Sequence, residues 1–206
     1  MPWGTESVST RSYHERMGTR DRIIDAAEQA IHEFGIAGAT TRRIARQAGC
    51  SEALLYKHFA GKESLFLAVL LERLPALRPA LTRLQASVGQ GDVAANLAEF
   101  AAAALEFYSK AAAIASGVLA DPSLLAGFRT MLADRNAGPH LPILALAEIL
   151  RAEQQGGRID AGMDAGAAAS MLMGACFHRA NLAYYVDLPE EDAAWAAGIA
   201  TTLIRR

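Results

Sequence analysis

Apolar residues recur at three- and four-residue steps along almost the whole chain, which is the spacing of one face of an α-helix. Ile23, Ala27, Ile31 and Phe34 form one such row, and Gly35 is expected to end that helix. We find no convincing segment that alternates apolar and polar residues as a half-buried strand does. The pattern therefore predicts an all-α protein of about nine helices.

The longer apolar stretches are each interrupted by charge. Glu, Lys, Arg or Asp occurs before any of them reaches the roughly 20 residues that a membrane-spanning helix needs. Two cysteines in 206 residues are too few for a disulfide framework and fit a reducing compartment. We therefore expect a cytoplasmic protein without a membrane partner.

Between residues 40 and 59 the helical pattern breaks into unusually short pieces. Thr40 or Thr41 can cap a first helix that Gly49 closes, and Ser51 can cap a second that ends near Phe59. Two short helices joined by a turn of three or four residues that contains glycine form a helix-turn-helix. In that motif the first helix supports the second, whose N-terminal residues reach base edges in the major groove of DNA.

The same stretch is basic, although the whole chain has a formal net charge of −2. From Thr40 to Lys62, five Lys or Arg residues stand against a single acid, Glu52. Arginine can pair with guanine through two hydrogen bonds, while lysines, hydroxyls and helix N-termini hold phosphates. A charged helical surface without a partner would carry the same charge, but the turn spacing favours binding to double-stranded DNA.

The stretch TTRRIARQAGCSEALLYKHFAGKESLF resembles the signature of the tetracycline-repressor (TetR) family of bacterial regulators. About a dozen positions agree in order, among them the Ile-Ala, Ala-Gly, Leu-Tyr, His-Phe and Lys-Glu pairs, and the likeness covers residues 20–66. The resemblance implies a homeodomain-like helix-turn-helix domain over residues 19–66 and a ligand-binding and dimerisation domain over residues 67–206. Residues 1–18 are expected to form a flexible arm.

Carried over by position, the resemblance implies ten DNA-binding residues. Those expected to touch phosphates or the groove rim are Thr41, Arg42 and Arg43. Those expected at base edges are Ser51, Glu52, Ala53 and Lys57. Those expected to clamp the DNA backbone are Tyr56, His58 and Lys62. Ala53 replaces a glycine that is common in the family, and Cys50 replaces a valine. The Cys50 thiol, near a helix N-terminus, leaves a redox-sensing alternative open.

The resemblance also implies that the last two helices, expected over residues 165–186 and 190–205, form a two-fold homodimer. Both carry small or apolar residues around much of their circumference, as close helix packing requires. Two recognition helices in register are needed because operator half-sites lie about 34–36 Å apart. The alternative is that the same residues simply form the core of a monomer.

A small-molecule effector is expected to bind among large, soft or aromatic residues that stand amid many alanines. The large candidates are Phe100, Phe107, Phe128, Met131, Met173 and Phe177, and the polar candidates are Asn96 and Asn181. The alternative is that these polar residues serve only the core or the surface. Such a pocket favours a hydrophobic or amphipathic ligand. The sequence indicates no cofactor, because the five histidines lack metal-ligand spacing, and no enzyme, because phosphate loops and nucleophile motifs are missing.

The expected function is that of a ligand-responsive transcriptional regulator that acts as a repressor on a (pseudo)palindromic operator. Pro75 and Pro79 predict a kink or break after the helix that begins at Lys62. Tilting that helix would move the recognition helix and release DNA. The alternative is a helical protein-interaction module without specific DNA binding, which would explain the apolar helices but not the ordered motif.

Overall fold

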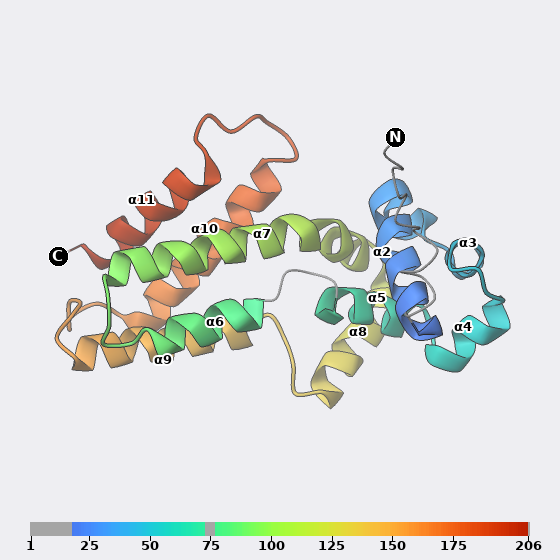
Figure 1. The fold of residues 1–206 in the computed structure, drawn as a ribbon, viewed down its shortest axis with the longest axis horizontal. Helices are drawn as coiled ribbons and strands as arrows, with labels where there is room; N and C mark the ends of the chain where they lie inside the picture. Colours follow the sequence, from blue (N-terminus) through green and yellow to red (C-terminus); the bar gives the residue numbers. More distant parts are fainter. Residues whose placement is uncertain (1–17, 73–76, 206) are drawn as a thin grey trace, which may run out of the picture. The chain divides into compact units, whose positions relative to one another are not determined.

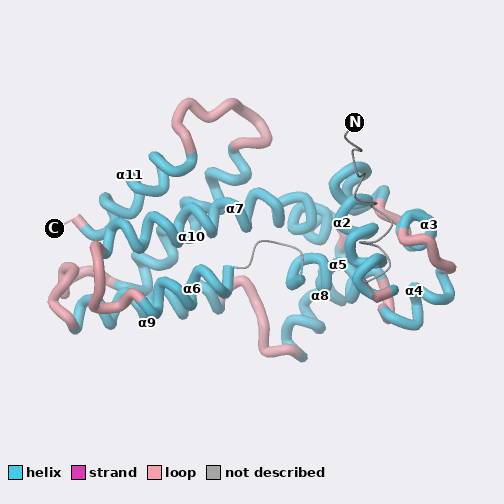
Figure 2. Tube along the Cα trace, in the orientation of Figure 1, coloured by secondary structure: helices cyan, strands magenta, loops and turns pink. Residues whose placement is uncertain are grey.

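The computed structural model describes residues 18–72 and 77–205 (Figure 1). Within those ranges every regular element is a helix (Figure 2), which confirms the expected all-α fold. In chain order the helices are α2 (Thr19–Gly38), α3 (Thr41–Gln47), α4 (Glu52–His58), α5 (Lys62–Glu72), α6 (Leu77–Ala86), α7 (Val93–Ala120), α8 (Pro122–Asp134), α9 (Leu141–Gln155), α10 (Ala165–Leu182) and α11 (Asp192–Ile204). The expected arm, apart from Gly18, and Pro75 lie outside the described residues.

Side-chain caps set where several helices begin. The hydroxyl oxygens of Thr40 and Ser51 accept the amide three residues on, at 3.3 and 3.1 Å. Asp121 accepts two amides at the start of α8, at 2.9 and 3.0 Å. Asp164 accepts two at the start of α10, at 2.8 and 3.0 Å, and these donors lower the pKa of its carboxyl. The helix starts expected near Thr40, at Ser51 and at residue 165 are confirmed.

The end of α2 differs from the expectation. The helix bends at Gly35, whose φ of 64° is a left-handed conformation that glycine adopts without strain, and a short turn then continues to Gly38. Phe34, expected in the buried row, is 47% exposed. The reason is that its ring supports the guanidinium of Arg43, 4.0 Å away, instead of packing into the core.

α6 also differs from the expectation, and α7 is unusually long. Pro79 does not break a helix, because it is the third residue of α6 and first-turn amides need no intrahelical partner. α7 is 28 residues long and continues to Ala120. Despite this length, no single helix in the described ranges is long and apolar enough to cross a bilayer, and α7 and α8 pass that test only as a bent pair.

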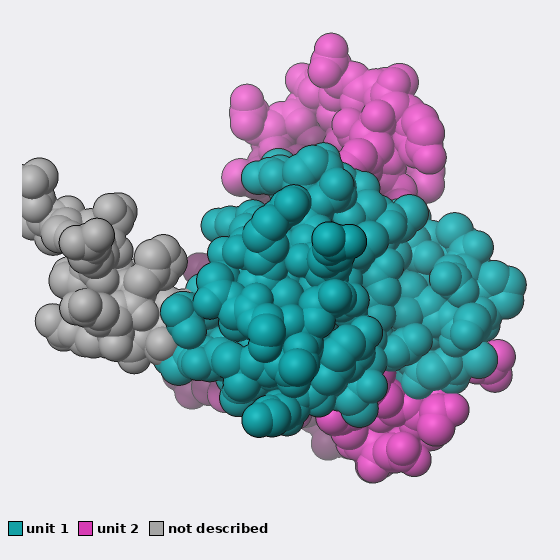
Figure 3. All heavy atoms as spheres, turned by 90° about the vertical axis from the view of Figure 1, so that its right-hand side faces the viewer, with its two compact units in different colours: residues 1–73, 116–128 teal, residues 74–115, 129–206 magenta. Residues whose placement is uncertain are grey.

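The chain forms two compact units (Figure 3). One comprises residues 1–73 and 116–128, and the other comprises residues 74–115 and 129–206. The first unit thus includes the end of α7 and the start of α8. A Cβ added at Gly117 would stand 2.5 Å from Ile36 Cβ, and one added at Gly127 would stand 3.0 Å from Glu63 Cγ. Glycine at both positions lets the segment 116–128 pack closely on α2 and α5.

The second unit has an apolar core of its own, formed by α6, α7, α9, α10 and α11. Its most deeply buried large residues include Leu97, Phe100, Leu146, Leu150, Leu172 and Met173. A buried carboxylate beside this core is paired with a partly exposed arginine: Glu153 Oε2 lies 3.0 Å from Arg158 Nε. Arg158 also donates to two carbonyls of the loop before α7. The pair therefore joins the α6–α7 loop to the end of α9.

Candidate DNA-binding site

The packing of α3 against α4 defines the geometry of the basic segment. Each helix has seven residues, well below the about 12–15 at which isolated helices become marginally stable in water. Ile44 of α3 and Leu55 of α4 are fully buried, and Phe59, the residue after α4, is also buried. Gly49 turns the chain with φ at 66°, and the Cys50 amide donates to a carbonyl of α3 at 2.9 Å. These contacts fix the angle between the two helices.

The outward faces of α3 and α4 carry most of the side chains expected to meet DNA. On α4 and just before it, the exposed residues are Ser51, Glu52, Ala53, Tyr56, Lys57 and His58. On α3, Arg42 and Arg46 are exposed. Arg42, Arg46 and Lys57, here called the exposed cations, make no hydrogen bond or ion pair with any other described residue. Their charges are therefore available to an anionic partner.

Three hydroxyls on this face, those of Ser51, Thr41 and Tyr56, differ in their hydrogen bonds. Ser51 Oγ accepts an amide hydrogen bond, so its own proton remains available to a phosphate oxygen. Thr41 Oγ1 donates to Glu52 Oε1 at 2.8 Å. The Tyr56 hydroxyl donates to Thr41 Oγ1 at 3.5 Å, which is long for a hydrogen bond between oxygens. Glu52 is thus held by α3, although it belongs to α4.

Two of the expected DNA-binding cations point into the protein. Arg43 stacks on Phe34 and donates to the Gly38 carbonyl at 2.5 Å. Lys62 donates to the Ile36 carbonyl at 2.8 Å. Both therefore satisfy carbonyls that the bent end of α2 leaves without helical partners. Part of the positive charge in this segment stabilises the fold, and the exposed cations remain for a ligand.

Burial shifts the pKa of two side chains in this unit. It lowers the pKa of the Lys62 ammonium, and the carboxylates of Asp121 and Glu63 act in the opposite direction. It raises the pKa of the Cys50 thiol, and Arg22 only partly opposes this. A redox-sensing cysteine needs a lowered pKa, because the thiolate is the reactive form. The direction at Cys50 therefore argues against the redox-sensing alternative.

Sequence reasoning missed two parts of this unit. Arg20, at the start of α2, makes a bidentate ion pair with Glu72 at the end of α5, with both N–O distances at 2.7 Å. Its guanidinium also lies 5.4 Å from the centre of the Phe59 ring. The second part is the segment 116–128, which packs on α2 and α5. Neither has a local signal in the sequence, since the partners are far apart along the chain.

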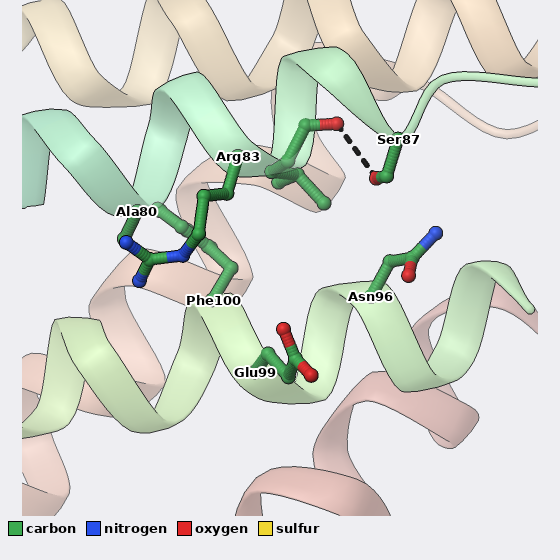
Figure 4. A pocket seen from close by; sticks show the side chains of 7 residues that line it. Ala80, Arg83, Ser87, Asn96, Glu99 and Phe100 are labelled. Carbon is green, nitrogen blue, oxygen red and sulfur yellow. Dashed lines mark hydrogen bonds between the residues drawn. The ribbon is translucent and has the colours of Figure 1, made fainter. Parts of the chain in front are cut away.

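The residues expected to line an effector pocket occupy several places. Phe100 and Met173 are core residues of the second unit, 2% and 1% exposed. Asn96 and Phe100 line a cavity of about 40 Å³ between α6 and α7, together with Arg83, Ser87 and Glu99 (Figure 4). Drug-sized ligands occupy pockets of roughly 300–1,000 Å³. This cavity has the size of a water site, so a larger ligand there would require α6 and α7 to separate.

The other candidates lie outside that cavity. Phe107, Tyr108 and Phe177 form an edge-to-face aromatic row across α7 and α10, with ring centres 5.4 and 5.5 Å apart. Burial raises the pKa of Tyr108 to about 12. Asn181 donates to the carbonyl of Phe177 in its own helix at 2.7 Å. Phe128 belongs to the first unit and Met131 to the second, each half-buried on α8.

The two short helices, their glycine turn and their exposed cations place the chain in the class of helix-turn-helix proteins. Residues 23–69 match the family model of bacterial regulatory proteins, tetR family. The chain is 46% identical over 66 residues to the HTH-type transcriptional regulator SrpR of Pseudomonas putida, and the match covers 32% of this chain and 31% of that protein. Residues 23–69 are therefore a domain of the tetR family type, and the chain aligns with only about a third of the length of this curated relative.

Solved structures extend the likeness over most of the chain. The fatty acid degradation regulator FadR from Bacillus halodurans superposes with a TM-score of 0.68 at 20% identity, covering 92% of this chain and 96% of that one. The transcriptional regulator FadR from Bacillus subtilis, solved in complex with stearoyl-CoA, gives a TM-score of 0.65 at 20% identity, covering 90% and 97%. At this identity the likeness shows a shared fold, including the helices beyond the family match.

Proposed function

We propose that the protein is a ligand-responsive transcriptional repressor that binds a (pseudo)palindromic operator as a homodimer and is released by a small hydrophobic or amphipathic effector. The observation that carries this proposal is the exposed face of α3 and α4, where cations and hydroxyls stand on a buried apolar support. α4 is the recognition helix, and its N-terminal residues Ser51, Glu52 and Ala53 meet base edges in the major groove.

The exposed cations set the expected salt dependence. Arg42, Arg46 and Lys57 are available in each subunit, whereas Arg43 and Lys62 are engaged inside the fold. Each neutralised phosphate contributes about −0.9 to the slope of log affinity against log salt. Three phosphate contacts in each of two subunits therefore give a slope of about −5. A slope near zero would be inconsistent with this use of the basic face.

Dimerisation through α10 and α11 is supported by the side chains that a single subunit leaves exposed. Ala167, Met171 and Gly174 lie on one face of α10 and are exposed, with Met171 at 67%. α11 exposes Ala197 and Gly198 together with neighbouring small residues. Small residues allow close helix approach, and an exposed methionine beside them gains from burial. A second copy of the same two helices is the proposed cover.

We propose that effector binding releases DNA through a movement of α7. This helix is continuous, with residues 93–115 in the second unit and residues 116–120 in the first. Within the first unit, the segment 116–128 packs on Ile36 and on Glu63, the second residue of α5. Three residues separate α5 from the recognition helix α4. A shift of α7 would therefore reach α5 and α4. The stearoyl-CoA found with one structural relative supports the amphipathic effector class.

Selection of bound sequences from random DNA, with the full-length protein, tests this function. Two inverted half-sites with a fixed spacing of about one helical turn or a multiple are expected. Repeating the selection with long-chain acyl-CoAs and other amphipathic compounds then tests release. Enrichment of no sequence at low ionic strength would contradict DNA regulation and favour a protein-interaction module.

A further inference from the structure

We propose that Glu52 is an internal stand-in for a DNA phosphate, and that its release from Thr41 makes DNA binding selective. In the free protein the carboxylate holds the Thr41 hydroxyl. On binding, a DNA phosphate oxygen replaces Glu52 as the acceptor of the Thr41 hydroxyl hydrogen bond. The freed Glu52 carboxylate then finds a new donor only where a base edge offers an amine. The inference rests on the proposed function, because it concerns how the same face discriminates between DNA sites.

The first support is the geometry. Thr41 opens α3 and Glu52 opens α4, and these neighbouring helices (Figure 1) bring Thr41 Oγ1 to 2.8 Å from Glu52 Oε1. That distance is normal for a hydroxyl donating to an oxygen acceptor. The contact from Tyr56 to the same Thr41 oxygen is longer, at 3.5 Å, and therefore much weaker. Thr41 and Glu52 form the bond that DNA would have to break.

The second support is that the Thr41 hydroxyl has a single proton to donate. A threonine hydroxyl has one proton, so it can donate to only one acceptor at a time. If Thr41 donates to a phosphate oxygen, it must stop donating to Glu52. Ser51 differs, because its oxygen accepts from the Leu54 amide and its proton is unspent. Ser51 can bind a phosphate without rearrangement, whereas Thr41 can do so only by exchanging one anion for another.

The third support is the position of the freed charge. Glu52 is the only acid between Thr40 and Lys62, and it is exposed on α4, as Tyr56 and Lys57 are. Against DNA, an unpaired carboxylate is repelled by the phosphates. Cytosine and adenine present amine donors in the major groove, and a carboxylate can accept from them. At sites without such an amine the freed carboxylate has no partner, so those sites are penalised.

Glu52→Gln is the informative variant. Its amide oxygen still accepts from Thr41, but its release exposes no charge, so wrong sites lose their penalty. We expect affinity for a random duplex to rise about tenfold and the ratio of operator to random affinity to fall by about the same factor, the lower end of base discrimination by one contact. Fluorescence anisotropy on a selected site and on a random duplex of equal length, at matched salt, measures both. Glu33→Gln, which removes an exposed acid of α2, is the matched control and should leave the ratio unchanged.

Thr41 distinguishes competition for a hydroxyl from simple charge repulsion. In a Thr41→Val background Glu52 has no hydroxyl to lose, so Glu52→Gln should raise random-duplex affinity less than it does in the wild type, by the share that charge repulsion alone contributes. In a Thr41→Ser background the full effect should return. Equal effects of Glu52→Gln in the Val and Ser backgrounds, or an unchanged specificity ratio, would overturn the inference while leaving the proposed function intact. A wild-type protein without any site preference would instead overturn the proposed function itself.

Discussion

Replacing Arg43 with alanine is expected to destabilise the fold, whereas replacing its neighbour Arg42 is expected to weaken DNA binding. Arg43 donates to the Gly38 carbonyl at 2.5 Å and lies 4.0 Å from the centre of the Phe34 ring. A hydrogen bond from a charged donor contributes about 1.5–3 kcal/mol, and an exposed cation–π contact about 0.5–1 kcal/mol. Because both are partly exposed to solvent, we expect a loss of about 2 kcal/mol in the free energy of unfolding.

Arg42 should behave in the opposite way. It is exposed and makes no bond to another described residue, so Arg42→Ala should change the free energy of unfolding by less than about 0.5 kcal/mol. The same variant should make the salt slope of DNA binding shallower by about 1 per subunit. Urea unfolding followed by circular dichroism, with salt-dependent anisotropy on one duplex, separates the two effects.

The control for both variants is Arg78→Ala, an exposed arginine of α6 in the second unit, which should change neither quantity. Equal destabilisation by Arg42→Ala and Arg43→Ala would refute the claim that Arg43 stabilises the end of α2. A salt slope that falls with Arg43→Ala but not with Arg42→Ala, measured on fully folded protein, would reverse the assigned roles.

Three further outcomes are expected. Met171→Arg, at a side chain 67% exposed on α10, should convert a dimer into a monomer in size-exclusion chromatography. Burial raises the pKa of Cys50 and raises that of Cys176 to about 12, so thiol reagents at pH 7.5 should react slowly with the native protein, and peroxide should leave DNA binding intact. Backbone donors lower the pKa of the Asp164 carboxyl, so this carboxylate stabilises the folded state fully above its ordinary pKa of 3.8. That stabilisation is lost as the pH falls through the lower pKa of the folded state. The difference in urea midpoint between the wild type and Asp164→Ala should therefore shrink as the pH is lowered through this range.

Local features of the fold could be predicted because their causes are local. Ser51 and Asp164 begin helices through hydrogen bonds to amides two or three residues away. Gly49 turns the chain through its own φ. Such interactions depend only on a few neighbouring residues, so the order of residues in the sequence is enough to place them.

Interactions between distant segments could not be predicted in the same way. The row that ends at Phe34 has helical spacing, but whether its last residue is buried depends on the bend at Gly35 and on Arg43 from the next helix. Likewise, nothing in the sequence around Gly117 indicates that this glycine packs against Ile36. Charge patterning identified a basic segment without showing that Lys62 is turned towards a carbonyl.

The most direct test of DNA binding by α3 and α4 is the affinity and stoichiometry of the wild-type protein on a selected palindromic duplex across a range of salt concentrations. We expect two chains per duplex, a log–log slope of about −5, and clear preference over a duplex with one half-site scrambled. One chain per duplex, or equal affinity for the intact and the scrambled site, would contradict the account.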